Sequence, residues 1–327
     1  MAFVPAPGFQ PLYNPPIPFR SPIYGGLRPG MSVYIQGEVP HHVTRFAVNF
    51  SCGPYDGADI ALHFNPRFDG KDKVVFNSFQ DGSWGPEEKK RDSFPFHKGR
   101  HFELVFFINP GGYQVNVNGS PFYEYCHRVP FERVECVHVD GDVNIQSLSV
   151  VGGGGNLGGG AMTFPAYPQD GGVMPLPSYP SGNLPVMGLP TYNPPVPYFG
   201  MMPGGLSSKR TVVVRGFIPE GAQSFHINFK VTSSDDIALH FNPRLYESTV
   251  VRNSCLGGEW GSEERELVFN PFVPGQYFDI SIRCGNFRYK IFTNGQQLCE
   301  FAHRFQAFPM IDGLEIGGDV ILSFVQV

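Results

Sequence analysis

The chain lacks long apolar runs, runs of basic residues and any extended helical period. The run from Leu104 to Ile108 is typical of its longest apolar stretches, far below the roughly 20 residues that span a bilayer as a helix. Lys and Arg are scattered and the formal net charge is −5, which argues against a surface for nucleic acid or anionic membrane. We therefore expect neither a membrane-spanning nor a nucleic-acid-binding protein.

Cysteine is scarce, and its pattern indicates neither metal binding nor disulfides. The six cysteines form no CxxC pair or His/Cys cluster, so no metal and no cofactor are expected. Three fall in each half of the chain, at positions that do not match across the repeat described below (Cys52, Cys126 and Cys136; Cys255, Cys284 and Cys299). Inherited disulfides would match, so free thiols are predicted.

The chain contains one residue pattern that occurs twice. Each copy holds one His, two Asn, two cations, one Glu and one of the two tryptophans. The first copy comprises His63, Asn65, Arg67, Asn77, Trp84, Glu87 and Lys89, and the second His240, Asn242, Arg244, Asn253, Trp260, Glu263 and Arg265. Polar groups beside one exposed indole favour a neutral polar ligand with a flat apolar side, such as a sugar.

The duplication extends well beyond this pattern. Tyr13-Asn14-Pro15-Pro16 returns as Tyr192-Asn193-Pro194-Pro195, and Asn118-Gly119 returns as Asn294-Gly295. A repeat of this length is a domain rather than a solenoid unit. The length of 327 residues agrees, since about 150 residues per domain predicts two.

Composition sets the domain boundaries. Between 152 and 195 glycines come in runs, prolines follow, and Asp170 is the only charged residue, so this segment reads as a flexible linker with a reach of roughly 35 Å. We predict a Pro/aromatic-rich tail over 1–16, a first domain over 17–151, the linker over 152–195 and a second domain over 196–327. The tail is expected either to be disordered or to lie along the first domain.

Within each repeat the pattern is β throughout. Short β-branched or aromatic segments are separated by Gly, Pro or Asp, and Asn118-Gly119 is a strong hairpin signal. The expected strands of the first repeat include 32–37, 46–50, 60–64, 102–106 and 113–117. Short strands at regular spacing predict an all-β fold of two antiparallel two-sheet sandwiches.

Strand parity separates core from polar face in the segment from Ile60 to Arg67. Leu62 and Phe64 share one face, whereas His63, Asn65 and Arg67 share the other. Pro66 cannot donate to the ladder, so the ladder is expected to loosen there. Trp84 and Trp260 follow glycine-rich turns, where an indole can stand exposed.

The H-x-N-P-R, V-x-N and W-G-x-E-x-K/R set, present twice around a Gly/Pro-rich linker, resembles a tandem-repeat galectin. The resemblance covers everything outside the linker and tail. It implies two jelly-roll-like antiparallel sandwiches, each binding a β-galactoside on a concave sheet face.

The resemblance also implies roles for the repeated residues. His63, Asn65 and Arg67 would bind the axial 4-hydroxyl of galactose, Asn77 and Glu87 would take the 6-hydroxyl, and Trp84 would stack on the ring. Arg67, Glu87 and Lys89 would reach the adjoining sugar. The second copy would repeat these roles through His240, Asn242, Arg244, Asn253, Trp260, Glu263 and Arg265.

Three departures predict that the two sites differ. Lys89 stands where the second copy has Arg265, and Lys cannot offer a planar two-pronged donor. The turn before Asn77 is one residue longer than the turn before Asn253. Arg45 aligns with Ser224, so we expect a cation beside the first site alone and a preference there for acidic glycans such as sulfated galactosides.

Other repeated polar residues are expected to be structural or solvated. Glu88 and Glu264 are predicted to face solvent. The pairs His127-Arg128 and His303-Arg304 follow apolar strands and favour a structural role over a functional one.

Two rival functions remain open from the residues. Several acids repeat, as a glycoside hydrolase would require, but Glu87 is flanked by cations that would lower its pKa, the wrong direction for a general acid. The Pro/Tyr-rich segments would suit an intracellular interaction protein that does not use sugars.

The expectation we favour is a non-enzymatic, bivalent β-galactoside lectin that crosslinks glycoproteins or glycolipids, as in cell adhesion. Met1 to Pro5 carries no basic segment, so we expect cytosolic synthesis without a signal peptide. The resemblance implies an extracellular or cell-surface pool reached by unconventional secretion. Self-association through the tail or linker is a further expectation, while nucleic-acid binding and membrane insertion are not expected.

Overall fold

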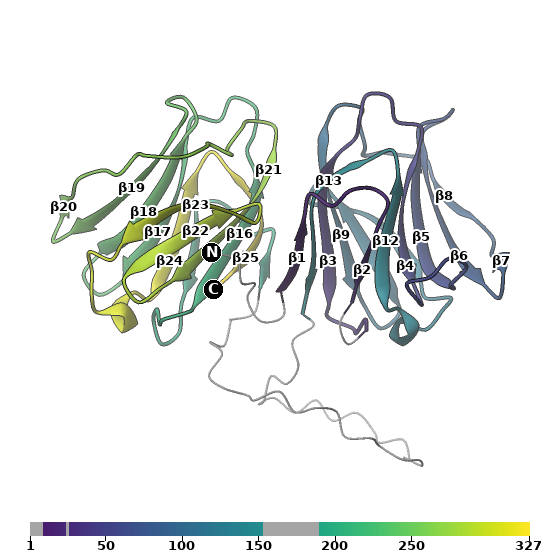
Figure 1. Ribbon diagram of the computed structural model, residues 1–327, viewed down its shortest axis with the longest axis horizontal. Helices are drawn as coiled ribbons and strands as arrows, with labels where there is room; N and C mark the ends of the chain where they lie inside the picture. The colour runs from purple at the N-terminus through teal and green to yellow at the C-terminus, as the bar shows by residue number, and fades with distance from the viewer. Residues whose placement is uncertain (1–8, 24–25, 153–189) are drawn as a thin grey trace, which may run out of the picture.

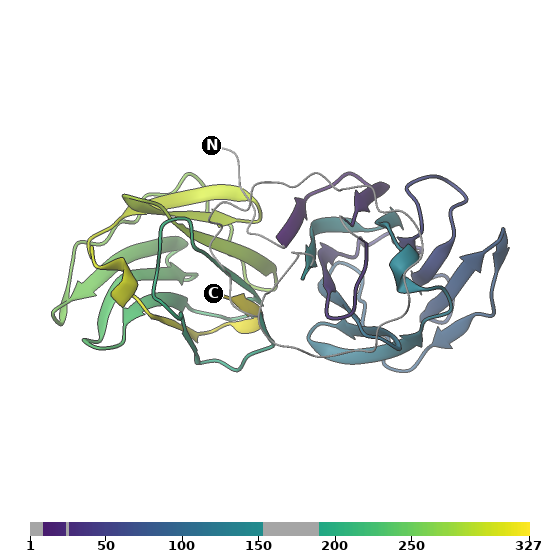
Figure 2. The same ribbon diagram turned by 90° about the horizontal axis from the view of Figure 1, so that it is seen from below.

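The protein consists of two β-sandwich domains lying side by side (Figures 1 and 2). The computed structural model describes residues 9–23, 26–152 and 190–327. Each domain has two antiparallel sheets, as predicted, and we call them the front sheet and the back sheet. No helix in the described part of the chain is long and apolar enough to cross a membrane.

The first domain has a seven-stranded front sheet and a six-stranded back sheet. The front sheet runs in the order β2 (Phe19–Pro22), β12 (Cys136–Gly141), β4 (Phe46–Ser51), β5 (Ile60–Arg67), β6 (Lys73–Gln80) and β7 (Ser83–Trp84), with β8 (Glu88–Lys90) also paired to β6. The back sheet runs β1 (Phe9–Tyr13), β13 (Asn144–Val151), β3 (Ser32–Glu38), β9 (His101–Ile108), β10 (Gly112–Val117) and β11 (Ser120–Cys126). A short 3-10 helix, η1 (Phe131–Arg133), lies between β11 and β12.

The second domain repeats this order with two six-stranded sheets. Its front sheet runs β15 (Tyr198–Met201), β24 (Gly313–Gly318), β17 (Phe225–Val231), β18 (Asp236–Arg244), β19 (Thr249–Leu256) and β20 (Glu259–Trp260). Its back sheet runs β14 (Thr191–Tyr192), β25 (Ile321–Gln326), β16 (Thr211–Phe217), β21 (Tyr277–Cys284), β22 (Arg288–Thr293) and β23 (Gln296–Ala302). The 3-10 helix η2 (Phe308–Met310) corresponds to η1.

Aromatic side chains fill the space between the two sheets of each domain. Phe64 of the front sheet meets Phe106 of the back sheet edge to face, with ring centroids 5.4 Å apart. In the second domain Phe229 meets Tyr289 in the same way at 5.5 Å. All four side chains are buried, and truncating such a ring costs about 3–5 kcal/mol. This core fixes the inward face of β5 and leaves its polar residues outside.

The predicted hairpin at Asn118-Gly119 is confirmed. Val117 pairs with Ser120, so the turn has two residues, with φ of 51° at Asn118 and 76° at Gly119. These positive values are those of a type I′ turn, which glycine adopts without strain. The equivalent turn at Asn294-Gly295 has φ of 46° and 77°.

Part of the expected tail and the end of the expected linker belong to the back sheets. Strand β1 pairs with β13 across Phe9 to Tyr13, and β14 pairs with β25 at Thr191 and Tyr192. Residues 1–8 and 153–189, on which the expected flexibility and self-association largely depend, lie outside the described residues.

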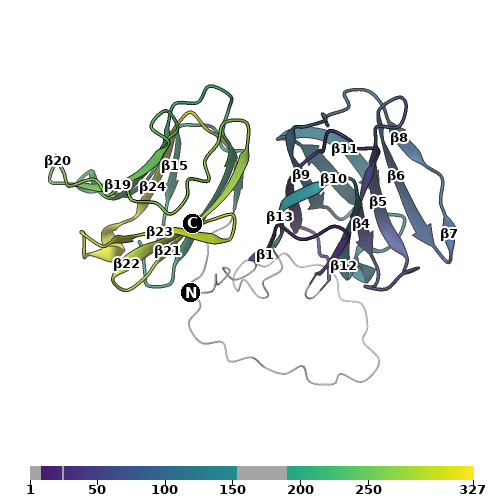
Figure 3. The ribbon, with the colours of Figure 1, turned by 45° about the horizontal axis from the view of Figure 1, so that its top comes forward.

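A third apolar cluster lies between the back sheets of the two domains. Its buried members are Tyr34, Val105 and Val151 of the first domain and Val213 and Phe324 of the second. Figure 3 shows β13 and β1 on the side of the first domain that faces the second. The front sheets are therefore the outer layers of the molecule.

Candidate functional site: a polar hollow over each front sheet

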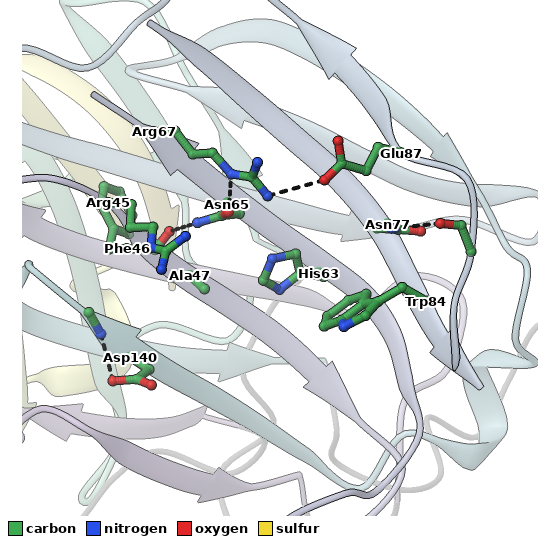
Figure 4. A pocket seen from close by; sticks show the side chains of 12 residues that line it. Arg45, Phe46, Ala47, His63, Asn65, Arg67, Asn77, Trp84, Glu87 and Asp140 are labelled. Atoms are coloured by element: carbon green, nitrogen blue, oxygen red, sulfur yellow. Dashed lines mark hydrogen bonds and ion pairs between the residues drawn. The ribbon is translucent and has the colours of Figure 1, made fainter. Parts of the chain in front are cut away.

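Seven of the eight predicted residues of the first site line one hollow of about 470 Å³ over the front sheet (Figure 4). They come from the edge of β4, from β5 and β6, and from β7 and the loop after it: Arg45, His63, Asn65, Arg67, Asn77, Trp84 and Glu87. The eighth, Lys89, reaches the rim from β8 and contacts Glu87. Strand register accounts for the grouping, because His63 lies opposite both Asn49 on β4 and Asn77 on β6.

His63 is a neutral imidazole with an available acceptor. Its Nδ1 lies 2.6 Å from Oδ1 of Asn49, and since an amide oxygen only accepts, Nδ1 carries the proton. Burial lowers the pKa of His63 to about 4, so the ring is neutral at physiological pH. Nε2 is therefore left as a hydrogen-bond acceptor for a ligand hydroxyl.

Asn65 compensates for the proline that follows it. Phe46 lies opposite Pro66 in the register set by the Arg45–Arg67 bridge, and Pro66 has no N–H to donate to the Phe46 carbonyl oxygen. Asn65 Nδ2 donates to that oxygen instead, at 2.6 Å. The predicted loosening at Pro66 thus occurs on the β4 side, while Pro66 stays paired with Val74 of β6.

Arg67 is held by two acceptors and fixes the orientation of Glu87. Its Nε donates to Asn65 Oδ1 at 2.6 Å and its Nη2 to Glu87 Oε1 at 3.3 Å. Lys89 Nζ lies 2.7 Å from the other oxygen of Glu87. The hydrogen bond from Lys89, with the Arg67 charge nearby, lowers the pKa of Glu87, so this carboxylate stays ionised and accepts hydrogen bonds.

Asn77 is oriented by an arginine that the sequence analysis did not assign to the site. Its Nδ2 donates to the Gly85 carbonyl oxygen at 2.9 Å, and its Oδ1 accepts from Arg128 Nη1 at 3.2 Å. Arg128 also donates from Nη2 to Glu88 at 2.6 Å. In the sequence, the only indication of this role for Arg128 was that a His-Arg pair occurs in both halves of the chain.

Glu88 and Glu264 keep more than a third of their side chains exposed, 37% and 40%, but each also has partners within the protein. Glu88 is partly buried and also accepts from the Tyr123 hydroxyl at 2.7 Å. Glu264 pairs with Arg304 at 3.0 Å. Each glutamate therefore supplies a counter-charge to the arginine that orients the asparagine of its site.

Trp84 stands exposed at the edge of the hollow, as predicted. Its side chain is 52% exposed, and its ring centroid lies 4.8 Å from that of His63 and 5.2 Å from that of Phe79. An indole supported from behind yet open on one face can stack against the apolar face of a sugar ring.

The second domain contains the same network over its own front sheet. His240 Nδ1 lies 2.6 Å from Asn228 Oδ1, and Asn242 donates to the Phe225 carbonyl oxygen at 2.6 Å. Arg244 donates to Asn242 at 2.8 Å and to Glu263 at 3.0 Å. Asn253 donates to the Gly261 carbonyl oxygen at 2.8 Å and accepts from Arg304 at 2.9 Å. Burial lowers the pKa of His240 to about 4. Trp260 is 54% exposed and lies 4.9 Å from His240.

Comparison with known proteins assigns the family. The galactoside-binding lectin profile matches residues 18–150 and 197–327. The chain belongs to this family. It is a tandem-repeat galectin, similar to galectin-4 of Homo sapiens, with 56% identity over 328 residues covering 100% of both chains. Galectin-8 of Rattus norvegicus is 34% identical over 317 residues, covering 96% of each. Among solved structures, sheep galectin-11 in complex with glycerol is 31% identical, covers 42% of this chain and 98% of its own, and has a TM-score of 0.39.

The two hollows of this galectin differ on the flank formed by β4 and β12 in the first domain. Arg45, Ala47 and Asp140 line the first hollow. The bridges Arg45–Arg67 and Ser224–Arg244 show that Ser224 takes the place of Arg45. In the second domain His226 lies beside His240, with ring centroids 5.9 Å apart. A ligand that extends over this flank meets different charges in the two domains.

The opposite flank differs through Glu247, a residue that the sequence analysis missed. Glu247 lies in the turn after β18, 3.3 Å from Arg244 Nη1 and 2.7 Å from Arg265 Nη1. Arg265 also donates from Nε to Glu263 at 2.7 Å. The second domain therefore holds both its arginines with two carboxylates, whereas Arg67 and Lys89 share Glu87 alone among the ion pairs of the described residues.

Proposed function

We propose that this galectin is a bivalent lectin that binds β-galactosides in both hollows and crosslinks glycoproteins or glycolipids. The single observation that carries the proposal is the repeated network itself. Each domain presents a neutral histidine acceptor, four oriented polar side chains and one exposed indole over its front sheet.

The chemistry of the hollow favours one hydroxyl arrangement. A hydroxyl over β5 can donate to His63 Nε2 while it accepts from Arg67, whose guanidinium is already fixed by Asn65. A sugar whose hydroxyl points elsewhere leaves these partly buried groups without partners, which costs about 1–3 kcal/mol per group. The axial 4-hydroxyl of galactose, assigned here through the family resemblance, would satisfy both.

The indoles supply contact area on the other side of the sugar. Stacking on Trp84 or Trp260 would cover the C–H face of galactose, while the histidine and arginine read its hydroxyls. Loss of one indole is therefore expected to weaken binding to any galactoside at that domain.

The first test is retention of the full chain on immobilised lactose, compared with Trp84→Ala, Trp260→Ala and the double variant. We expect each single variant to be retained more weakly and the double variant to pass through. Free lactose should elute the wild type, whereas cellobiose, which differs in the 4-hydroxyl of its terminal sugar, should not. Elution by both disaccharides, or retention of a folded double variant, would reject the assignment.

Crosslinking requires both sites on one chain. Vesicles bearing a lactosyl lipid should aggregate with the wild type and disperse again on addition of lactose. Either single tryptophan variant should coat the vesicles without aggregating them. Aggregation by a single variant would show that self-association of chains, rather than two sugar sites on one chain, causes the crosslinking.

Galectins are carbohydrate-binding lectins rather than enzymes, and the site carboxylate agrees. Glu87 is held ionised because the hydrogen bond from Lys89 lowers its pKa, so it cannot act as the general acid of a glycosidase. The rival hypothesis of a sugar-independent interaction protein would be supported if partner binding persisted in excess lactose.

For the first site we propose a preference for sulfated galactosides through Arg45. Arg45 lines this hollow, and Ser224 stands in its place in the second domain. Asp140 lines the same hollow and opposes an anion. The second site is silenced by Trp260→Ala. In that background Arg45→Ser should lower the affinity for sulfated lactose more than the affinity for lactose. Asp140→Asn should raise the affinity for sulfated lactose more than the affinity for lactose. Equal effects on both sugars would sink the proposal.

We also propose that the protein is made in the cytosol and acts on cell-surface glycans. Support comes from its cysteines, all six of which are free thiols, as suits a reducing compartment. Release of the chain from expressing cells should persist when transport from the endoplasmic reticulum to the Golgi is blocked. Release that stops with the block would contradict the proposal.

A further inference from the structure

We infer that the two domains are docked back to back as one fixed unit, with the back sheet of each domain as the binding surface for the other. The docking itself does not rest on the lectin proposal. Its consequence, that two sugar sites are held facing away from each other, does.

The first support is an apolar cluster that only the other domain covers. Val105 and Val213 lie on the outward faces of their sandwiches, and both are buried. Tyr34 stacks against Tyr192 at 6.2 Å and meets Phe324 edge to face at 5.6 Å. These side chains would be exposed to solvent on an isolated domain, so docking removes their apolar surface from water.

The second support is a set of charged and polar side chains buried at the same junction. Arg215 and Asp279 of the second domain are each 1% exposed and pair through Nε and Oδ2 at 2.8 Å. Glu103 of the first domain, also 1% exposed, accepts from Gln36 at 2.9 Å and from Ser323 of the second domain at 2.8 Å. Charges at the centre of an accidental contact would be unpaired and costly.

The buried arginine also contacts two aromatic rings, one of them across the junction. The Arg215 guanidinium lies 5.0 Å from the ring centroid of Tyr34 in the other domain and 5.2 Å from that of Phe324. Burial raises the pKa of both Glu103 and Asp279, and the nearby Arg215 charge opposes the rise in each case. The Arg215 guanidinium therefore acts on one carboxyl group from each domain, which adds an electrostatic attraction between the two back sheets.

The junction is also pseudo-symmetric, as expected for two copies of one surface. Gln36 pairs in register with Glu103, and Arg215 pairs in register with Asp279 at the equivalent positions. The tyrosine that opens each repeat crosses to the opposite domain. Tyr192 bonds to the Ser32 hydroxyl at 3.3 Å, and its counterpart Tyr13 hydrogen-bonds to Asp279.

Because the back sheets face each other, the front sheets are the two outermost layers. Figure 1 places β6 to β8 at one end of the molecule and β18 to β20 at the other. The two hollows then open in opposite directions. Such a molecule bridges two opposing glycan surfaces rather than gripping one surface twice.

The test uses the full chain with Val213→Asp, which puts a charge into the apolar cluster. If the domains separate, residue 213 becomes an exposed strand position, so the domain can still fold. Tyr34→Arg places a second cation beside Arg215 from the first domain. Gln114→Asp, on β10 of a back sheet and outside the cluster, is the matched control.

Docking is measured by small-angle X-ray scattering and by the rotational correlation time. We expect a single compact particle for the wild type and the control. Both interface variants should show a larger radius of gyration and a correlation time lowered roughly twofold, because each domain holds about half of the residues. Circular dichroism checks that the variants remain folded.

Three outcomes would overturn the inference. They are a wild type that already scatters as two independent domains, folded interface variants that scatter like the wild type, and a doubled mass in light scattering, which would show that the back sheets join two chains instead. Retention on lactose is measured in parallel. Loss of docking with retained lactose binding separates this inference from the proposed function.

Discussion

At the scale of single residues, the two hollows depend on side chains that satisfy backbone and side-chain partners at once. Asn65 supplies the hydrogen bond that Pro66 cannot make and also accepts from Arg67. Asn242 does the same in the second domain. The missing N–H of the proline thus gives a physical reason for the asparagine before it in both domains.

The buried histidines predict an acid-resistant site. His63 and His240 have pKa values of about 4 because burial disfavours the charged ring. The neutral form supplies the Nε2 acceptor, so lactose affinity should be constant from pH 7 to about 5 and fall as the pH drops through about 4. Titration calorimetry at stepped pH measures this.

Unfolding must be separated from loss of the acceptor. The unfolded chain takes up protons near the ordinary histidine pKa of about 6.5, whereas the folded chain does not, so stability also declines as the pH falls below that value. Circular dichroism at each pH monitors the fold. Affinity that halves near pH 6.5 in a folded protein would show that the histidines are not held neutral.

Arg304 is expected to act on sugar binding without touching the sugar. It orients Asn253 at 2.9 Å and is balanced by Glu264. In the Trp84→Ala background, Arg304→Ala should lower lactose affinity about tenfold, since a lost hydrogen bond to a charged group costs about 1.5–3 kcal/mol. The control is Arg133→Ala, which removes a surface arginine that pairs with Asp59 in the other domain. It should leave the lactose affinity within twofold of the starting value.

At the scale of elements, alternation along a strand determines which site residues can be predicted from the sequence. Alternation along β5 predicted which side chains face the core and which face the hollow, and the glycine-rich turns predicted exposed tryptophans. Arg128 and Glu88 lie 40 positions apart, and no local pattern links them. Glu247 was missed although it lies three positions from Arg244, because its other partner, Arg265, is 18 positions away and in no strand.

The hairpin between β10 and β11 gives a stability prediction. Gly119 has φ of 76°, a conformation that costs a residue with a Cβ about 1–2 kcal/mol. Gly119→Ala should lower the free energy of unfolding by this amount in thermal or denaturant melts. Gly111→Ala, where φ is not positive and a Cβ meets nothing within 4 Å, should change stability by less than about 0.5 kcal/mol.

At the scale of the whole molecule, the packing of the two domains was beyond the reach of the sequence. The repeat predicted two similar domains, and the composition of the linker suggested independent motion. Nothing in the order of residues marks Tyr34 or Val213 as interface rather than core, because both belong to ordinary apolar strands. Only the assembled back sheets bring Arg215 under Tyr34.

Docked domains predict a narrow gap between bridged surfaces. Four stacked sheets about 10 Å apart set the outer layers about 30 Å from each other. Stacks of lactosyl-lipid bilayers bridged by the wild type should therefore give one sharp lamellar repeat in small-angle X-ray diffraction. Val213→Asp should broaden that repeat and shift it to larger values, whereas Gln114→Asp should not.

A bridge of constant height has a consequence for the membranes on either side. Where many such bridges hold two cell surfaces together, glycoproteins taller than the gap are squeezed out of the contact and short glycolipids are kept within it. By helping to fix the distance between the two outer sheets, the buried arginine would then influence which glycoproteins remain in the contact between two neighbouring cells.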